Sequence, residues 1–177
     1  MHGTEAPSSW VCRWTSLLRP GAQVLDLACG GGRHMQWLAA QGHAVLGVDR
    51  SPEALALASE FGPTLQADIE NGPWPLHART FDAVVVTNYL WRQILASIAP
   101  GGALIYETFA RGHETVGRPS RPDFLLAPGE LLQVASQGGL RVLGYEDGFL
   151  GNPERFVQRL AAVRETASTP PPRWPLA

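Results

Sequence analysis

Short apolar runs alternate with amphipathic stretches along most of this 177-residue chain. The runs are bounded by Gly, Pro, Asn or Asp, and the run at 81–88 is rich in β-branched residues, as is typical of a buried strand. Together they predict strands at 23–28, 44–49, 64–68, 81–88, 103–109, 141–147 and 155–165. Because strands alternate with helical patterns, we predict an α/β fold in which helices cover a parallel sheet.

Helices are predicted where a capping residue opens a stretch with apolar side chains at helical spacing. Ser8 or Ser9 can cap a first helix, and Ser51, followed by a proline and an acid, opens another. Further helices are expected at about 33–41, 90–98 and 130–137.

Breaks in the pattern predict the loops. Residues 69–81 contain the breakers Gly72, Pro73, Trp74 and Pro75, and the long polar segment 110–128 is rich in Arg, Gly and Pro. A turn is expected at 100–102. A Gly-Asn-Pro sequence separates the last two strands, which can form an antiparallel hairpin. We therefore predict one domain over 1–165, followed by a proline-rich tail at 166–177 that is expected to be disordered.

Composition and charge exclude several classes of function. The apolar fraction of 45% and the charged fraction of 17% are those of an ordinary globular protein. A net charge of −2 gives no electrostatic basis for binding nucleic acid or an anionic membrane, and no apolar run reaches membrane-spanning length. Two cysteines form neither a disulfide framework nor a metal-ligand spacing, and no signal peptide is recognised. We expect a cytoplasmic protein without a metal; the sequence makes no prediction of oligomeric state.

Polar residues occur regularly where the predicted strands end. Asp26, Asp49, Asp68 and Asn88 fall at the C-terminal ends of four successive strands. Ligands of open parallel sheets bind outside these ends, so the four residues predict a single site. The alternative is that they cap the helices that follow.

The sequence DLACGGGRH at 26–34 indicates what this site binds. A glycine-rich turn and the helix after it attract anions, but the carboxylate of Asp26 would repel a diphosphate. An amino-acid zwitterion suits the turn better, with its ammonium toward Asp26 and its carboxylate at the loop amides and Arg33. S-adenosylmethionine (SAM) joins such a zwitterion to adenosine through a cationic sulfonium, so SAM is the expected cofactor.

A dinucleotide remains the alternative ligand. Gly30 and Gly32 match the first two glycines of G-x-G-x-x-G, but Met35 occupies the third position. Asp49 follows Gly30 by 19 residues, a spacing that suits the ribose hydroxyls of NAD and of any other adenosine ligand. An NAD-dependent oxidoreductase is therefore the alternative function, weakened by Met35 and Asp26.

The stretch VLDLACGGGRHMQWLAAQGHAVLGVDRSPEALALA (24–58) resembles the first two motifs of the class I SAM-dependent methyltransferases. Ala28 stands where that family has its first glycine, which is expected to be tolerated if the backbone keeps an ordinary conformation. The sequences Gly-Arg after the loop and Asp-x-Ser-Pro after the second strand, with the segment 110–132, are similar to the small tellurite-resistance-type branch. The resemblance covers roughly residues 20–146 and implies a Rossmann-like, doubly wound sheet of seven mostly parallel strands with an antiparallel last strand.

The resemblance also implies a role for each matching position. Gly30 and Gly32 would allow close approach of the ligand, Asp26 would face its amino-acid end, and Asp49 would hold the ribose hydroxyls. The remaining positions would surround the adenine or the methyl group: Arg50 or Ser51 beside the adenine, Asp68 at its amino group, Ile69 on its ring, and Thr87 and Asn88 at the methyl.

Methyl transfer needs mainly proximity and orientation, which supply up to about 7–11 kcal/mol when the geometry is right. A base is needed only if the acceptor loses a proton. Tyr89, after the fourth strand, and His113, in the segment 110–128, are the candidate catalytic residues. The length of that segment favours a substrate loop or lid, and its arginines would suit an anionic acceptor; the alternative is an ordinary solvated loop.

These observations predict an enzyme that transfers the methyl group of SAM to a small molecule. A thiol, a metalloid oxyanion, a carboxylate and an amine all remain possible acceptors. The compact predicted sheet leaves no obvious further domain for gripping a macromolecule. Because no base is unmistakable, a non-enzymatic SAM-binding protein is a second alternative.

Overall fold

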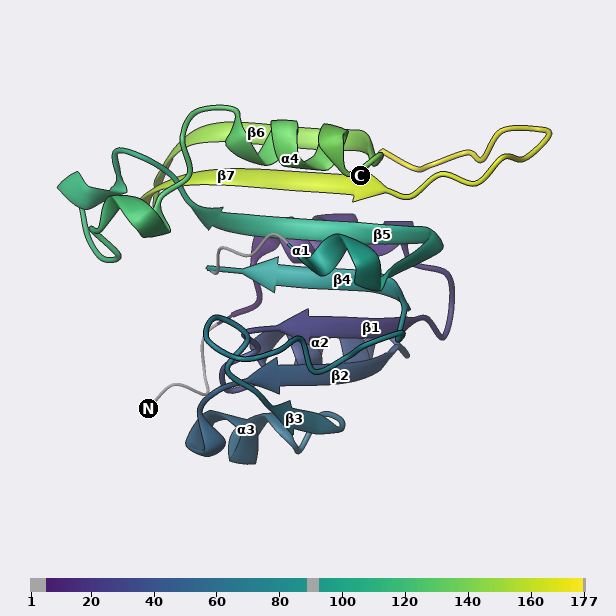
Figure 1. Cartoon of the computed structure of the whole chain (residues 1–177), viewed down its shortest axis with the longest axis horizontal. Helices are drawn as coiled ribbons and strands as arrows, with labels where there is room; N and C mark the ends of the chain where they lie inside the picture. The colour runs from purple at the N-terminus through teal and green to yellow at the C-terminus, as the bar shows by residue number, and fades with distance from the viewer. Residues whose placement is uncertain (1–5, 89–92, 177) are drawn as a thin grey trace.

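Seven strands form one sheet in the order β3-β2-β1-β4-β5-β7-β6 (Figure 1). The computed structural model describes residues 6–88 and 93–176. The strands are β1 Gln23–Leu27, β2 Ala44–Asp49, β3 Thr64–Gln66, β4 Phe81–Thr87, β5 Ile98–Phe109, β6 Arg141–Gly151 and β7 Glu154–Val163. All pairs among β1 to β5 are parallel, whereas β7 runs antiparallel to both β5 and β6. The predicted fold class, with its antiparallel last strand, is confirmed.

Helices cover both faces of the sheet. One face carries α1 Ser9–Trp14, α2 Arg33–Ala40 and α3 Pro52–Ala58, and the other carries α4 Glu130–Gln137 (Figure 1). The sequence explains where these helices begin: Ser8 accepts a hydrogen bond from the backbone N of Trp10, and Ser51 accepts one from the backbone N of Ala54. Both caps agree with the sequence prediction.

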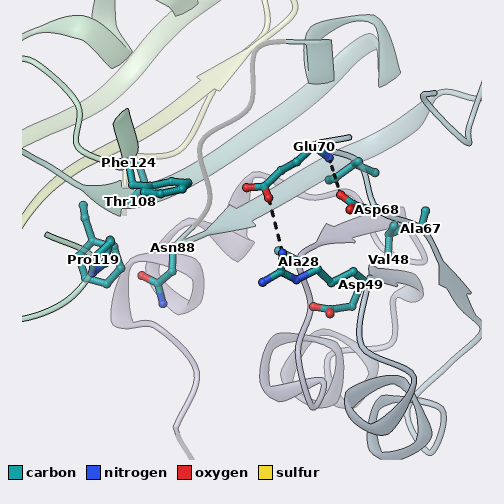
Figure 2. Close-up of a pocket in the computed structure, with 13 residues that line it drawn as sticks. Ala28, Val48, Asp49, Ala67, Asp68, Glu70, Asn88, Thr108, Pro119 and Phe124 are labelled. Carbon is teal, nitrogen blue, oxygen red and sulfur yellow. Dashed lines mark hydrogen bonds and ion pairs between the residues drawn. The ribbon is translucent and has the colours of Figure 1, made fainter. Parts of the chain in front are cut away.

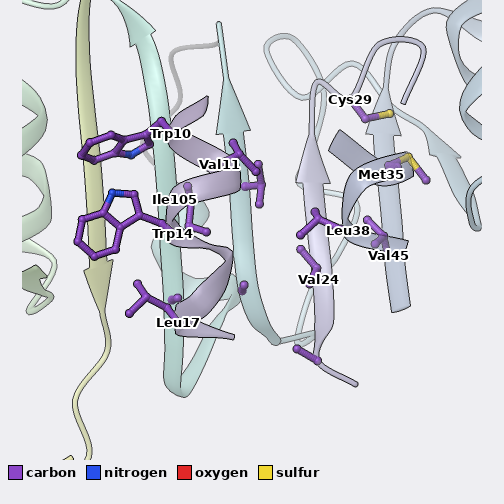
Figure 3. Packing of buried hydrophobic residues seen from close by; sticks show 14 of the residues in the cluster. Trp10, Val11, Trp14, Leu17, Val24, Cys29, Met35, Leu38, Val45 and Ile105 are labelled. Atoms are coloured by element: carbon purple, nitrogen blue, oxygen red, sulfur yellow. The ribbon is translucent and has the colours of Figure 1, made fainter. Parts of the chain in front are cut away.

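The core has two layers because neighbouring residues of a strand point to opposite faces. On β1, Val24 belongs to the layer beneath α1 to α3, and Leu25 belongs to the layer on the other side. Figure 3 shows the first layer, where Trp10 and Trp14 of α1 pack beside Ile105 of β5. Burial of both faces explains why the central strands are continuous apolar runs.

Some element boundaries differ from the prediction. The strand β5 begins at Ile98, five residues before the predicted start, and the turn expected at 100–102 is an irregularity inside it. Its register with β4 jumps from the pair Phe81–Ile98 to the pair Ala83–Ala103. Of the helix predicted at 90–98, the described part is a 3₁₀ helix at Gln93–Ser97.

The C-terminal residues 166–176 form neither helix nor strand, although the indole of Trp174 packs against the first core layer. The domain boundary at residue 165 stays a prediction. Among the residues that the structure describes, no helix is long and apolar enough to cross a membrane.

Candidate functional site

The carboxyl ends of β1, β2 and β4 meet at one edge of the sheet, beside a cavity of about 380 Å³. Figure 2 shows polar residues around it: Asp49 ends β2, Asp68 comes shortly after β3, and Asn88 follows β4. The cavity is lined by Ala28, Val48, Asp49, Arg50, Ala67, Asp68, Ile69, Glu70, Asn88, Thr108, Phe109, Pro119 and Phe124. We call it the first cavity. Its volume lies within the usual range for a small-molecule site.

A second cavity of about 330 Å³ lies over the glycine-rich loop. It is lined by Ala28, Cys29, Gly30, Gly31, Arg33, His34, Ala54, Thr87 and Asn88. Ala28 and Asn88 line both cavities. An elongated ligand that occupies both cavities would therefore have its middle at these two residues.

Asp49 joins the loop to the strand beside it. One carboxylate oxygen, Oδ2, accepts a hydrogen bond from the backbone N of Gly30 at 2.9 Å, and Oδ1 accepts one from the backbone N of Ser51 at 2.9 Å. Because each carboxylate oxygen can accept more than one hydrogen bond, Asp49 keeps acceptor capacity toward the first cavity.

Asp26, on β1, is fully buried, and neither of its carboxylate oxygens has a hydrogen-bond partner among residues 6–88 and 93–176. Burial raises the pKa of Asp26 to about 8; the charge of Arg33 opposes this rise, and the charge of Asp49 adds to it. A buried carboxyl group without a partner is costly, so a cationic ligand group placed nearby would be favourable. Arg33 and Cys29, which line the second cavity, both interact electrostatically with Asp26.

Gly30 and Gly32 of the loop are glycines for different structural reasons. Gly30 has φ +53°, and a Cβ there would meet no atom within 4 Å, which leaves the loop backbone open to a ligand. Gly32, the N-cap of α2, has φ +84° and lies in neither cavity lining; a Cβ there would approach Ala58 Cα to 2.9 Å. Helix packing therefore explains why Gly32 is a glycine.

The backbone at Ala28 does not meet the condition under which an alanine would be tolerated there. Its φ is +53°, in the left-handed region, rather than an ordinary value. The left-handed conformation costs a residue with a Cβ about 1–2 kcal/mol of conformational free energy. The glycine of the family's motif would therefore fit this backbone better than alanine does. Asn88 also has a positive φ, of 56°, which asparagine tolerates well.

The side chains of Arg33 and Arg50 each line one of the cavities. The guanidinium of Arg33 lies 3.5 Å from the backbone O of Ala6, and the side chain lines the second cavity. Arg50 lines the first cavity and pairs with Glu70 at 3.7 Å (Figure 2). Ser51 lies in neither lining and caps α3.

Asp68 and Ile69 follow β3 and line the first cavity. The Asn71 side chain donates a hydrogen bond to Oδ2 of Asp68, and the backbone N of Asn71 and of Glu70 donate to Oδ1. These bonds, the first of them most, hold the pKa of Asp68 below its usual value. Ile69 is buried, and Thr87 is buried in the lining of the second cavity. Asp68, Ile69 and Thr87 thus line the cavities at the edge of the sheet where the sequence predicted a site.

The two predicted catalytic residues have different outcomes. Tyr89 lies outside the described residues. His113 is buried, stacks on Phe109 with ring centroids 4.3 Å apart, and has Nε2 3.0 Å from the backbone O of Arg118. Its side chain lines neither cavity, so its role as a base stays a prediction.

Sequence reasoning missed a buried charge cluster beside the site. Glu107 of β5 is fully buried and forms ion pairs with Arg159 at 2.7 Å and Arg155 at 3.3 Å. Ser8 donates a hydrogen bond to Glu107 from its hydroxyl and another from its backbone N to Nε2 of His34. The alternation of Arg155 and Arg159 with apolar residues on β7 was a usable signal, but the partners are distant in sequence.

Among the described residues, no group of three or more His, Cys, Asp or Glu side chains could hold a metal ion. Burial and the charge of Asp26 raise the pKa of the Cys29 thiol. A raised pKa disfavours the reactive thiolate, so a packing role suits Cys29 better than that of a nucleophile.

Known proteins are similar to this chain in sequence and in fold. A family model described as a methyltransferase domain matches residues 24–101. The chain is 30% identical over 153 residues to a ubiquinone biosynthesis O-methyltransferase of Coxiella burnetii, a match that covers 70% of this chain and 65% of that protein. The chain thus spans just under two thirds of the length of this relative.

Solved structures share the architecture. TehB from Haemophilus influenzae superposes with a TM-score of 0.74 at 21% identity, over 92% of this chain and 64% of TehB. A TehB-like SAM-dependent methyltransferase from Corynebacterium glutamicum superposes with a TM-score of 0.63 at 20% identity, over 86% of this chain and 85% of that structure. At these identities the likeness shows the fold.

The fold and the matched motifs thus define a Rossmann-like methyltransferase domain. The sequence match over residues 24–101 and the shared architecture make the chain similar to the class I SAM-dependent methyltransferases.

Proposed function

We propose that this protein binds SAM across the two cavities and transfers its methyl group to a small-molecule acceptor. The observation that carries the proposal is the junction at Ala28 and Asn88, which line both cavities. In SAM the sulfonium lies between the adenosine and the methionine portions. A ligand with adenosine in the first cavity and methionine in the second would therefore present its methyl group at this junction.

Two acids of the site support this orientation. Asp49 borders the first cavity, already holds the backbone N of Gly30, and has acceptor capacity left for ribose hydroxyls. Asp26 lies in neither lining, but it interacts electrostatically with Arg33 and Cys29 of the second cavity. Its buried carboxyl group has no hydrogen-bond partner among the described residues, which suits an ammonium group. Arg33 and the open backbone at Gly30 suit the carboxylate of the same zwitterion.

SAM supplies an activated methyl group on a sulfonium, so the protein's main task is to orient the acceptor for in-line attack. Asn88 is well placed for this, because its backbone N donates a hydrogen bond to the backbone O of Glu107 at 2.8 Å. The bond fixes the end of β4 against β5 at the junction. Asp68 and Ile69 would hold the adenine, and Thr87 would lie against the methyl-bearing end.

A small acceptor is favoured over a macromolecule by the charge and the architecture. The net charge of −2 offers little attraction for a nucleic acid. The described helices and strands belong to the one sheet and its covering layers, which leaves no separate element for gripping a macromolecule.

The test is production of S-adenosylhomocysteine from SAM across a panel of thiols, amines, carboxylates, hydroxylated aromatics, metalloid oxyanions and RNA. We expect turnover with a small acceptor. Turnover with RNA alone would contradict the acceptor class. Persistent silence with every acceptor, despite SAM binding, would favour a non-enzymatic SAM-binding protein.

A further inference from the structure

The two ends of the first cavity differ in chemistry. Figure 2 shows Asp49 and Asp68 at one end, while Thr108, Pro119 and Phe124 lie at the other, with Asn88 between them and Ala28. The second end is also lined by Phe109. If the adenosine of SAM occupies the acidic end, as proposed above, the acceptor must approach the junction from the other end.

Among the described lining residues, the charged ones lie at the end of β2 or just after β2 and β3, and the carboxylate of Glu70 reaches from there toward the middle of the cavity (Figure 2). They are Asp49, Arg50, Asp68 and Glu70, and Arg50 is paired with Glu70. Among the described lining residues, those at the acceptor end carry aromatic rings, a proline ring and a threonine hydroxyl, without a charge. A charged acceptor would lose its hydration there and gain no opposite charge in return.

The arginines of the segment 110–128 do not alter this picture. Arg121 lies 3.4 Å from the carboxylate of Asp123 and stacks its guanidinium 5.5 Å from the centre of the Phe124 ring. Arg111 and Arg118 are exposed and line neither cavity. The anionic acceptor that these arginines suggested in the sequence is therefore not supported by where they lie.

The apolar end is held in place by contacts within the segment. The backbone N of Leu126 donates to the O of Phe109, and the N of Arg111 donates to the O of Leu126, so the two ends of the segment are tied together. Inside it, His113 stacks on Phe109 and lies 3.0 Å from the O of Arg118, the residue before Pro119. The backbone of the segment is thus held by hydrogen bonds, and the ring of Phe109 is held by stacking on His113.

We propose that the acceptor is an uncharged, predominantly apolar small molecule whose ring packs between Phe109 and Phe124, with its nucleophilic atom directed toward Asn88. This inference rests on the proposed function and names the substrate class of the same site. Ring stacking on two phenylalanines and a proline would provide binding energy without a charge.

The test uses two probes that share one nucleophile and differ by one charge. Benzyl mercaptan and 4-(mercaptomethyl)benzoate are each titrated calorimetrically into the full chain saturated with S-adenosylhomocysteine. We expect the uncharged thiol to bind at least tenfold more tightly than the carboxylate. Tighter binding of the carboxylate, or no detectable binding of either probe, would overturn the inference.

Two variants localise the effect. Phe124 is 39% exposed and lines the cavity, whereas Phe149 is 49% exposed and lies outside both linings. We expect Phe124→Asp to weaken benzyl mercaptan at least tenfold and Phe149→Asp to change its affinity less than twofold. Equal effects of the two substitutions would contradict the assigned position of the acceptor.

The titration with S-adenosylhomocysteine that precedes each experiment separates the two claims. Failure of that first titration would contradict the proposed function. Its success followed by charge-independent binding of the probes would contradict the acceptor class alone.

Discussion

The carboxylate of Asp49, at the end of β2, accepts a hydrogen bond from the backbone N of Gly30, in the loop after β1, at 2.9 Å. The two residues are 19 positions apart in the sequence. The bond fixes the glycine-rich loop relative to the neighbouring strand, so one acid shapes the loop and also borders the first cavity.

Replacing this acid tests its role toward the ligand. We predict that Asp49→Ala weakens SAM binding by about 1.5–3 kcal/mol, the usual value of hydrogen bonds to a charged group. Isothermal titration with SAM measures the change. Asp82→Ala is the matched control, because Asp82 also accepts a backbone hydrogen bond, from Gln23 at the opposite end of the sheet. Unchanged SAM affinity in Asp49→Ala would remove this residue from the ribose.

The ionisation of Asp26 predicts how stability depends on pH. Its pKa in the folded chain is about 8, against 3.8 as the ordinary value. Between these values the folded chain holds a proton that the unfolded chain has released, so the free energy of unfolding falls as pH rises. His34 has the opposite slope: burial and Arg33 lower its pKa from 6.5 to about 3, so its contribution is present above about pH 6.5 and is lost toward pH 3.

The two slopes oppose each other between about pH 4 and 6.5, and only that of Asp26 remains above pH 6.5. We predict that urea unfolding shows the ligand-free protein losing stability between about pH 6.5 and 8, and that Asp26→Asn abolishes this loss. In the variant, stability should instead rise from about pH 3 to 6.5 and then level off. Identical pH profiles for the two proteins would show that Asp26 ionises normally.

The left-handed backbone at Ala28 predicts a stabilising substitution. A Cβ costs about 1–2 kcal/mol in this region, and the greater freedom of glycine in the unfolded chain offsets part of the gain. We therefore expect Ala28→Gly to stabilise the protein by up to about 1 kcal/mol, seen as a higher melting temperature. The same change at Ala56, inside α3, should destabilise by about 0.5–1 kcal/mol. A lower melting temperature for Ala28→Gly would contradict the assigned strain.

Substitutions of His113 distinguish a role in positioning the segment 110–128 from a role as a catalytic base. The contact between its Nε2 and the O of Arg118 favours a role in holding the segment. We predict that His113→Ala lowers kcat/KM for the acceptor and leaves SAM affinity unchanged. His113→Gln, whose amide can donate to the same carbonyl, should recover most of the activity without altering the pH profile. Failure of glutamine to rescue, with loss of a pH-dependent limb, would support the base.

Much of the fold was predictable because the central strands are buried on both faces. Strands of this kind are continuous apolar runs, which can be recognised in the sequence. The acids at the strand ends were predictable for a related reason, since parallel strands deliver their ends to one edge. The start of β5 was missed because Pro100, Gly101 and Gly102 read as a turn, whereas the strand accommodates them as an irregularity.

The acceptor end of the cavity could not be read from local patterns. Phe109 and Phe124 are 15 positions apart and meet the same cavity only because Leu126 pairs back onto Phe109 and Arg111. The arginines of the segment 110–128 suggested an anionic acceptor. In the structure, the segment is held instead by the stacking of His113 on Phe109. Likewise, the φ of Ala28 follows from the loop's geometry rather than from its residue type.

Equilibrium dialysis of the full chain against SAM and against NAD tests the central claim most directly. The geometry of Asp26, Gly30 and Asp49 predicts saturable binding of one SAM per chain and no measurable binding of NAD. Tight binding of NAD without binding of SAM would contradict the account.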